Sequence, residues 1–262
     1  MVIPPRNSVL GVGISVLNLP LATRTLLDAA QEPEHIGFVT VTGVHGVMES
    51  QDDAELLAIH NESFLTTPDG MPMVWLGRVA GHSEMQRVYG PDLMLEVLDQ
   101  GRSINVRHYF FGGNTGVAQE LKETLEERLP GLNVCGTYTP PFRPLTEEEE
   151  AELVADLKEK RPHFLWVGLS TPKQERFMHA FLKKYGAQLA TDHGLTLIGV
   201  GAAFDFHTGK VSQAPSWMQK SGLEWLYRLC SEPKRLWKRY AYNNPRFMLK
   251  VLPDVVKGLV NK

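Results

Sequence analysis

The amino-acid sequence predicts an α/β protein, in which a Rossmann-like, largely parallel sheet has helices on both faces and a basic helical appendage follows at the C-terminus. Short apolar segments with strand character alternate with amphipathic helical segments through about residue 210. Several strand segments are continuously apolar, which is typical of parallel strands buried on both faces. After about residue 211 the composition becomes basic and aromatic. We therefore divide the chain into a core, residues 1–210, and an appendage, residues 211–262.

The overall composition is that of a soluble globular protein. The chain has 262 residues, of which 43% are hydrophobic and 22% are charged, and its formal net charge is -3. This charge argues against a dedicated nucleic-acid binder. Cys135 and Cys230 lie far apart without metal-ligand spacing, so we expect neither a disulfide framework nor a zinc site. We find no signal peptide and no run of about 20 apolar residues, and expect a cytoplasmic protein that meets a membrane only from the side.

Strands and helices are expected to alternate along the core. The expected strands cover residues 9–17, 37–41, 107–111, 134–138, 163–168 and 196–200. The expected helices cover residues 21–30, 52–61, 91–100, 117–129 and 147–160, and a further helix follows Thr171. In that helix we predict Thr171 as the N-cap, Pro172 as the first helical residue and Gln174 as the capping-box partner. A capping role alone would be sufficient to explain why a glutamine occurs at position 174.

The turns after the strands are the expected ligand site, because ligands of parallel sheets bind outside the carboxyl ends of the strands. Turns after Val41, Phe111, Gly168 and Val200 would open on this same edge. The turn after Phe111 reads G-G-N-T-G and leads from a strand into a helix, as in nucleotide-binding βαβ units. It lacks the full G-x-G-x-x-G pattern and the P-loop lysine, so a phosphate site and a tight βα connection are equally open.

Asp69 is the first candidate for chemistry. It lies in a Pro-Asp-Gly turn in which Pro68 and Gly70 fix a tight bend, and an apolar run follows at once. The bend should hold the carboxylate at the lip of the fold, either as a turn former or as a catalytic base. Asp205, in F-D-F after the last expected strand, is the rival base. It could equally accept a hydrogen bond from a ribose or sugar hydroxyl, or simply cap Gly201.

The appendage combines cations, aromatic residues and an apolar stripe. Its aromatic residues are Trp217, Trp225, Tyr227, Trp237, Tyr240 and Tyr242, and cations are interleaved with them. This combination is typical of a segment that lies in an anionic membrane surface. It is equally typical of helices that pack on the core or on another subunit, so a homo-oligomer is a further option. Single-stranded nucleic acids are also bound by cations and aromatic residues, but no RNA-binding signature accompanies them, and we expect no nucleic-acid partner.

Six motifs, distributed in order along nearly the whole chain, carry a resemblance to a known family. They are P-D-G-M at residues 68–71, Q-R-V-Y-G-P-D at 86–92, F-F-G-G-N at 110–114, G-L-S-T-P-K-Q-E at 168–175, G-V-G-A-A-F-D-F-H-T-G at 199–209, and the stretch at 214–235. Together these motifs resemble the WecG/TagA/CpsF glycosyltransferase family, also called glycosyltransferase family 26.

The resemblance implies an inverting, metal-independent transfer of a hexose, N-acetylmannosamine or a relative, from a UDP-sugar without a cofactor. The implied acceptor is a polyprenyl-diphosphate-linked N-acetylglucosamine at the inner face of the cell membrane, which the appendage contacts, in the synthesis of a surface polysaccharide or teichoic acid. By position, Asp69 corresponds to the family's proposed base and Thr40 to a site threonine. The other implied substrate-binding residues are Thr42, Arg87, Gly112, Gly113, Asn114, Gln174, Asp205, Arg228, Arg235 and Lys238.

Two positions depart from the pattern of the family. Many members have Thr-x-Asn where this chain has Thr40-Val41-Thr42, and the third appendage cation is Lys238 where the family often has arginine. A lysine lacks the planar fork with which arginine binds a phosphate through two hydrogen bonds. The first departure leaves the donor sugar open, and the second is expected to soften diphosphate binding.

The residues themselves are consistent with this chemistry. A carboxylate has to take the proton of the acceptor hydroxyl, and positive charge has to receive the leaving diphosphate. The sequence has no D-x-D motif, so Arg87, Arg228 and Arg235 are expected to hold the departing UDP. Two other classes stay open at this stage: an NAD-binding Rossmann-type regulator or oxidoreductase, and a non-catalytic membrane adaptor that depends on the appendage alone.

Overall fold

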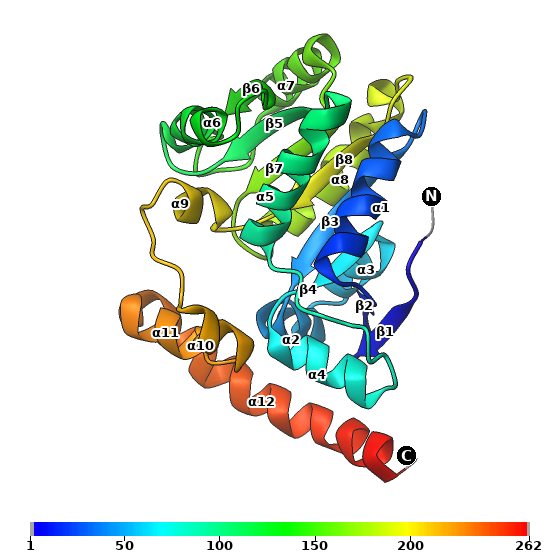
Figure 1. Ribbon diagram of the computed structural model, residues 1–262, viewed down its shortest axis with the longest axis vertical. Helices are drawn as coiled ribbons and strands as arrows, with labels where there is room; N and C mark the ends of the chain where they lie inside the picture. The colour runs from blue at the N-terminus through cyan, green and yellow to red at the C-terminus, as the bar shows by residue number, and fades with distance from the viewer. Residues whose placement is uncertain (1–2, 261–262) are drawn as a thin grey trace.

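A six-stranded parallel sheet forms the centre of the molecule (Figure 1). The structure is a computed structural model, which describes residues 3–260 and the side chains of residues 3–256. The strands lie in the order β4-β3-β8-β7-β5-β6, and every neighbouring pair is parallel. Their bounds are β3 (Ile36–Thr42), β4 (Leu65–Pro68), β5 (Arg107–Gly112), β6 (Asn133–Tyr138), β7 (Phe164–Gly168) and β8 (Leu195–Gly199). This arrangement confirms the predicted α/β class.

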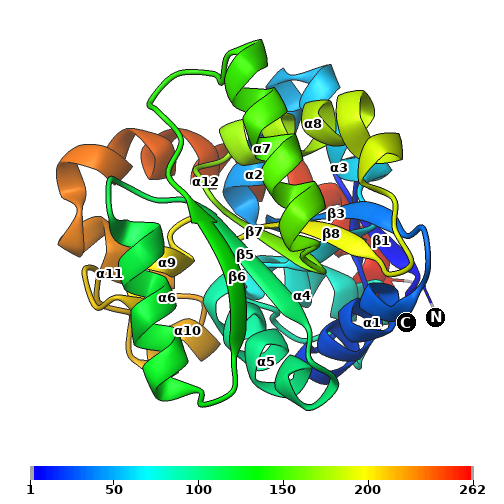
Figure 2. The ribbon, with the colours of Figure 1, turned by 90° about the horizontal axis from the view of Figure 1, so that it is seen from above.

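Helices cover both faces of the sheet (Figure 2). One face carries α1 (Leu19–Gln31), α5 (Gly90–Gly101) with the short η1 (Arg102–Ile104), α6 (Val117–Arg128) and α9 (Ala203–His207), and the other carries α3 (Ala54–Glu62), α7 (Glu147–Lys160) and α8 (Lys173–Leu189). Because side chains alternate across a strand, Phe110 and Trp166 are buried in the first layer, whereas Tyr109 and Leu165 are buried in the second. Both faces of the sheet are therefore buried, as continuously apolar strands predict.

The N-terminal segment forms a hairpin, so the single strand predicted for residues 9–17 is wrong. β1 (Arg6–Val9) and β2 (Val12–Ser15) pair antiparallel and form a separate two-stranded sheet. The two turn residues between them, Leu10 and Gly11, have φ angles of 51° and 87°. Two successive residues in the left-handed region are the geometry of a tight hairpin turn.

The region after β3 contains two helices where the sequence predicts one. α2 (Val44–Asp52) and α3 are separated at Asp53, whose side chain accepts a hydrogen bond from the backbone N–H of Leu56 (3.1 Å) and so caps α3. A further helix, α4 (Met71–Val79), covers the apolar run after the Pro-Asp-Gly turn, for which sequence analysis predicts no helix. Both differences add helical structure next to the carboxyl ends of β3 and β4.

The first turn of α8 differs from the predicted capping arrangement. The helix begins at Lys173, and Pro172 occupies the N-cap position without a side-chain capping bond. Thr171 instead donates its hydroxyl hydrogen bond to the side chain of Glu175 (2.9 Å), which is fully buried. A hydrogen bond to a carboxylate is stronger than one to a neutral acceptor, which explains why the hydroxyl turns away from the helix end.

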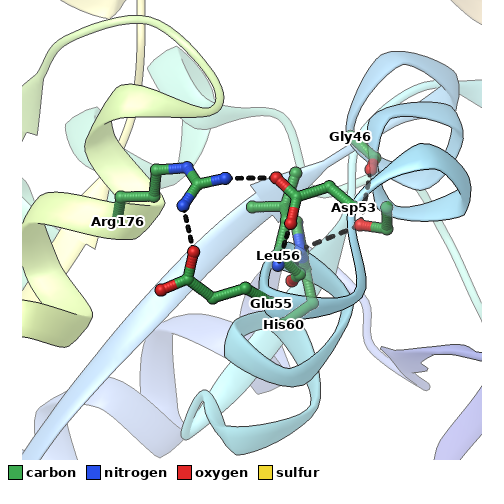
Figure 3. Close-up of polar contacts among 7 residues, drawn as sticks. Gly46, Asp53, Glu55, Leu56, His60 and Arg176 are labelled. Atoms are coloured by element: carbon green, nitrogen blue, oxygen red, sulfur yellow. Dashed lines mark hydrogen bonds and ion pairs between the residues drawn. The ribbon is translucent and has the colours of Figure 1, made fainter.

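Ion pairs and hydrogen bonds fasten α3 to its neighbours (Figure 3). Arg176 on α8 pairs with Asp53 and Glu55 at the start of α3. His60, further along α3, is buried, and its Nδ1 lies 3.3 Å from the hydroxyl oxygen of Ser50 on α2. These contacts hold α2, and with it the turn that follows β3, against the rest of the core.

The C-terminal helices α10 (Ser216–Lys220), α11 (Glu224–Ser231) and α12 (Pro233–Val260) form a layer beside the core, next to α2 and α4 in Figure 1. One face of α12 packs on these two helices and buries Phe247 and Val251. Arg246 adds a bidentate salt bridge to Asp52 on α2, with both distances at 2.8 Å. The appendage thus packs on the core through one face. Across residues 3–260, no helix is both long and apolar enough to span a membrane.

His108 should make the stability of the fold depend on pH. It is fully buried, its Nδ1 accepts a hydrogen bond from the indole of Trp166 (3.2 Å), and burial lowers its pKa to about 3. Below about pH 6.5 the unfolded chain gains a proton at this histidine that the folded chain does not gain. The contribution of the neutral His108 side chain to the free energy of unfolding is therefore complete above about pH 6.5. It is lost as the pH falls toward 3, by up to about 1.4 kcal/mol per pH unit.

We expect His108→Gln to lower the free energy of unfolding at neutral pH but to flatten its decrease between about pH 6.5 and 4.5, measured by urea unfolding. The free energy of unfolding of the variant should still decrease somewhat over this pH range. Burial together with His193 and Arg107 lowers the pKa of His163 to about 4, so His163 acts in the same direction as His108. A variant whose stability has the same pH slope as the parent protein would show that His108 is not responsible.

Candidate active site

A cavity of about 440 Å³ opens at the carboxyl edge of the sheet, with one wall in the core and the other in the C-terminal helices. The turns after β3, β4, β7 and β8 form the core wall, as the sequence predicts for the turns after β3, β7 and β8. Its residues include Gly43, His45, Asp69, Leu169, Ser170, Gly201 and Ala202. The volume lies within the usual range of small-molecule sites.

Asp69 lines this cavity, directly after β4. Its backbone N–H donates to the carbonyl oxygen of Thr42 on the neighbouring strand (3.0 Å). Gly43 allows the two turns to approach, because a Cβ atom at this position would lie 2.6 Å from the carbonyl oxygen of Asp69. Burial raises the pKa of the Asp69 carboxyl group, whereas the guanidinium groups of Arg87 and Arg228 lower it. A carboxylate with a raised pKa is a better proton acceptor near neutral pH.

Arg87 joins the core to the appendage. Its Nη1 donates to Oε1 of Gln219 (2.8 Å), and its Nη2 pairs with the carboxylate of Glu224. The guanidinium carbon lies 4.0 Å from the centre of the Tyr89 ring. The side chains of Arg87 and Glu224 are only 12% and 18% exposed, so removal of either one leaves a buried charge without its partner. Glu224 and Tyr89 line the cavity, whereas Arg87 lies outside the lining.

Two of the expected appendage cations line the cavity. Arg228 on α11 and Arg235 on α12 contribute to the wall opposite Asp69, and both lie beside Glu232, at 3.8 Å and 2.5 Å. Lys238 is exposed and is not part of the lining. Its Nζ lies 5.8 Å from the ring of Trp237 instead.

The two threonines of β3 lie inside the fold. Thr40 is fully buried and donates its hydroxyl hydrogen bond to Thr66 on β4 (3.2 Å). Thr42 is 1% exposed, and its hydroxyl has no hydrogen-bond partner within residues 3–256. Neither threonine is part of the cavity lining.

Gln174 lines the cavity, but the prediction that it caps α8 is wrong. Its Oε1 accepts from the backbone N–H of Gly201 (3.0 Å), and its Nε2 donates to Oε1 of Glu175 (3.0 Å). Each end of the amide thus has a partner inside the protein. The side chain ties the start of α8 to the turn after β8, and so fixes the position of that turn on the cavity wall.

The glycine-rich turn after β5 and the rival base lie outside the cavity lining. Gly112 packs against Gly168, where a Cβ atom would lie 2.6 Å from the carbonyl oxygen, and the N–H of Gly113 donates to that same oxygen (3.0 Å). Asn114 is exposed. A tight βα connection is sufficient to explain these glycines. Asp205 is half-buried on α9, and burial raises its pKa.

Sequence analysis missed several charged or polar residues on the cavity wall, among them Tyr89, Glu224 and Arg239. Tyr89 and Glu224 fall within the motifs at residues 86–92 and 214–235, so the motifs themselves were the available signal. Arg239 follows Lys238 directly, and only the rotational phase of α12 distinguishes the two cations.

The cavity combines a carboxylate with several guanidinium groups and an apolar wall that includes Trp75, Trp225 and Met248. Within the part of the chain that the structure describes, no group of three or more His, Cys, Asp or Glu side chains could hold a metal ion. A base beside fixed positive charge suits the transfer of a group away from an anionic leaving group. Fold and cavity describe an α/β protein with a candidate group-transfer site at the carboxyl edge of a parallel sheet.

Comparisons with known proteins identify the family. The model of the glycosyl transferase WecG/TagA/CpsF family matches residues 7–259, so the chain belongs to this family and is a glycosyltransferase. A relative from Bacillus spizizenii is 27% identical over 215 residues, which cover 82% of this chain and 78% of the relative. A relative from Bacillus subtilis is 28% identical over 203 residues, which cover 77% and 73%. Both are named N-acetylglucosaminyldiphosphoundecaprenol N-acetyl-beta-D-mannosaminyltransferase.

The connection between Arg87 and Glu224 can be measured with a double-mutant cycle. Arg87→Met and Glu224→Gln should each lower the free energy of unfolding by about 3 kcal/mol, because each leaves the charged side chain of the remaining partner buried without its counter-charge. The double variant should lose less than the sum of the two single losses, as measured by urea unfolding.

The salt bridge between Arg246 and Asp52 provides a matched control, since its side chains are 29% and 51% exposed. Arg246→Met should cost less than about 1 kcal/mol. Additive losses in the Arg87 cycle, or equal losses in the two pairs, would contradict a buried connection between core and appendage.

Proposed function

We propose that this glycosyltransferase moves N-acetylmannosamine, or a closely related hexose, from a UDP-sugar to a polyprenyl-diphosphate-linked N-acetylglucosamine. The names of the two relatives describe an N-acetylmannosamine transfer to an acceptor of this kind. The product would be an intermediate of a surface polysaccharide or teichoic acid. The observation that supports the proposal most is the position of Asp69 on the cavity wall, close enough to Arg87 and Arg228 for their charges to lower its pKa.

Asp69 is the proposed base. Its carboxylate takes the proton from the acceptor hydroxyl, and the hydroxyl oxygen forms a new bond to the anomeric carbon of the donor sugar. The bond from that carbon to the diphosphate oxygen breaks, and UDP leaves with the bonding electrons. A single displacement of this kind inverts the configuration of the anomeric centre.

Arginines on the opposite wall receive the negative charge that leaves with UDP. Guanidinium groups bind phosphate oxygens through pairs of charge-assisted hydrogen bonds, and Arg228 and Arg235 are available for this purpose. Both lie beside Glu232, which a bound diphosphate would replace as their partner. In this proposal the guanidinium groups take the part that a divalent ion has in other transferases, so the transfer is metal-independent.

The outer side of α12 supports peripheral binding to the inner face of the cell membrane. Trp237, Leu249, Leu252 and Val256 are all at least half exposed, at 52%, 73%, 56% and 51%. Met248, which is 66% exposed, also lines the cavity, so the apolar outer surface continues into the cavity wall. Exposed apolar residues together with cations bind anionic lipid surfaces. A lipid-linked acceptor could then reach Asp69 without leaving the membrane.

Asp69→Asn should lower kcat by about 10²- to 10⁴-fold, because the amide cannot accept the proton of the acceptor. UDP affinity should change little. In the parent enzyme, turnover should fall on the acid side as Asp69 becomes protonated, and burial places this fall above the ordinary carboxyl pKa of 3.8. Mass spectrometry of transfer from UDP-N-acetylmannosamine to a lipid-diphosphate-linked N-acetylglucosamine measures both effects.

Asp205→Asn is the comparison for that experiment, because Asp205 is the rival base. An Asp69→Asn variant as fast as the parent enzyme rejects the proposed role. If Asp205→Asn were the slower of the two variants by a hundredfold, the base would be Asp205.

The double variant Leu249→Ser/Leu252→Ser should bind anionic vesicles at least about tenfold more weakly, because it removes two exposed apolar side chains from the lipid-facing side of α12. Co-sedimentation with vesicles of phosphatidylglycerol and phosphatidylcholine measures this binding. Phe142→Ser is the matched control, since Phe142 is 88% exposed in a loop of the core. Equal binding by the double variant and the parent protein would refute docking through this face.

A further inference from the structure

We propose that Arg239, and not Lys238, is the third appendage cation that binds a diphosphate in the cavity. The assignment rests on the proposed function, because it requires a substrate that carries a diphosphate. The resemblance to the family points to residue 238, so the choice between these two adjacent cations has to come from the geometry of α12.

The two cations lie on different faces of α12. Arg239 lines the cavity, and so do Arg235, four residues before it, and Asn243, four residues after it. Residues four apart share one face of a helix. Lys238 is exposed and lies outside the lining, next to the ring of the exposed Trp237. The chain therefore keeps an arginine at the cavity, displaced by one residue from the position that the motif suggests.

Arg239 is also the arginine whose charge is not balanced. Arg228 and Arg235 lie beside Glu232, at 3.8 Å and 2.5 Å. The half-buried guanidinium of Arg239 makes neither a hydrogen bond nor a salt bridge within residues 3–256. A partly buried cation without a partner is unfavourable, and a ligand with negative charge removes that cost.

The surroundings of Arg239 add to the positive potential. Arg228 and Arg235 line the same cavity as Arg239; burial lowers the pKa of Arg239, and these two guanidinium groups lower it further. His45 on the core wall does not contribute charge at neutral pH, because burial and Arg239 lower its pKa to about 4. Tyr240 raises the pKa of Arg239, and Glu49 raises it least of these groups. Arg228, Arg235 and Arg239 thus line one wall, with Glu232 as the acid of the salt bridges of Arg228 and Arg235, and a group of three guanidinium groups suits a polyanion.

A diphosphate is the ligand that this site fits, and it can come from two sources. The nucleotide of the donor and the lipid of the acceptor both carry one. Inorganic pyrophosphate represents the shared chemistry, UDP the donor and farnesyl diphosphate the acceptor. Of UDP and farnesyl diphosphate, the probe that loses more affinity when Arg239 is replaced identifies the substrate whose diphosphate Arg239 binds.

Isothermal titration of the full chain with each probe, in the absence of lipid vesicles, tests the assignment. Arg239→Gln should weaken pyrophosphate binding, and binding of UDP or farnesyl diphosphate, by about tenfold or more. Arg239→Lys should lose part of that affinity, because it keeps the charge without the planar fork. Lys238→Gln and the matched control Lys234→Gln should remain within about twofold of the parent protein.

The outcomes separate this inference from the proposed function. If the parent protein binds UDP and Arg239→Gln binds all three probes equally well, the inference fails and the proposed function stands. A loss in Lys238→Gln as large as that in Arg239→Gln also overturns it. If the parent protein binds none of the probes, both fail. Thermal unfolding of each variant, with Arg239→Lys as the mildest change, distinguishes lost binding from lost folding.

Discussion

The buried pairing of Arg87 with Glu224 is the constraint on which the candidate site depends, because the cavity has one wall in the core and the other in the C-terminal helices. A buried ion pair adds little net stability, but separation of its partners is strongly unfavourable. The pair therefore fixes where α11 lies relative to the turns after β3 and β4. Arg228, one turn after Glu224 on α11, takes its place on the cavity wall as a consequence.

The same pairing governs the electrostatics around Asp69. Burial raises the pKa of its carboxyl group, and a cation close by restrains that rise. Arg87 is paired with Glu224, and it is still the charge that lowers the pKa of Asp69 most. Arg228 lies 3.8 Å from its nearest acid and is less completely balanced. The net result is a raised pKa for the Asp69 carboxyl group, and a raised pKa makes its carboxylate a better proton acceptor.

Much of the fold could be predicted from local sequence, because buried parallel strands are continuously apolar and β7 shows this over its whole length. The hairpin at Leu10 could not, since a leucine at positive φ carries no local signal of a turn. In the candidate site, the turn at Asp69 could be recognised from its proline and glycine. Its surroundings could not, because Arg87 and Glu224 are 137 residues apart in the sequence and meet only in the folded chain.

The long helix α12 shows where sequence patterns stop being sufficient. Phe247 packs on the core, Leu249 faces outward and Arg239 lines the cavity, so one helix carries three different surfaces. At 3.6 residues per turn, a step of one residue turns a side chain by about 100°, which is enough to move a cation from the cavity to the outer surface. The basic and aromatic composition predicts that the appendage meets anions and apolar surfaces. Which cation lies at the cavity and which at the outer surface depends on the face of α12 that packs against α2 and α4. This rotation of the helix about its axis is fixed by tertiary contacts.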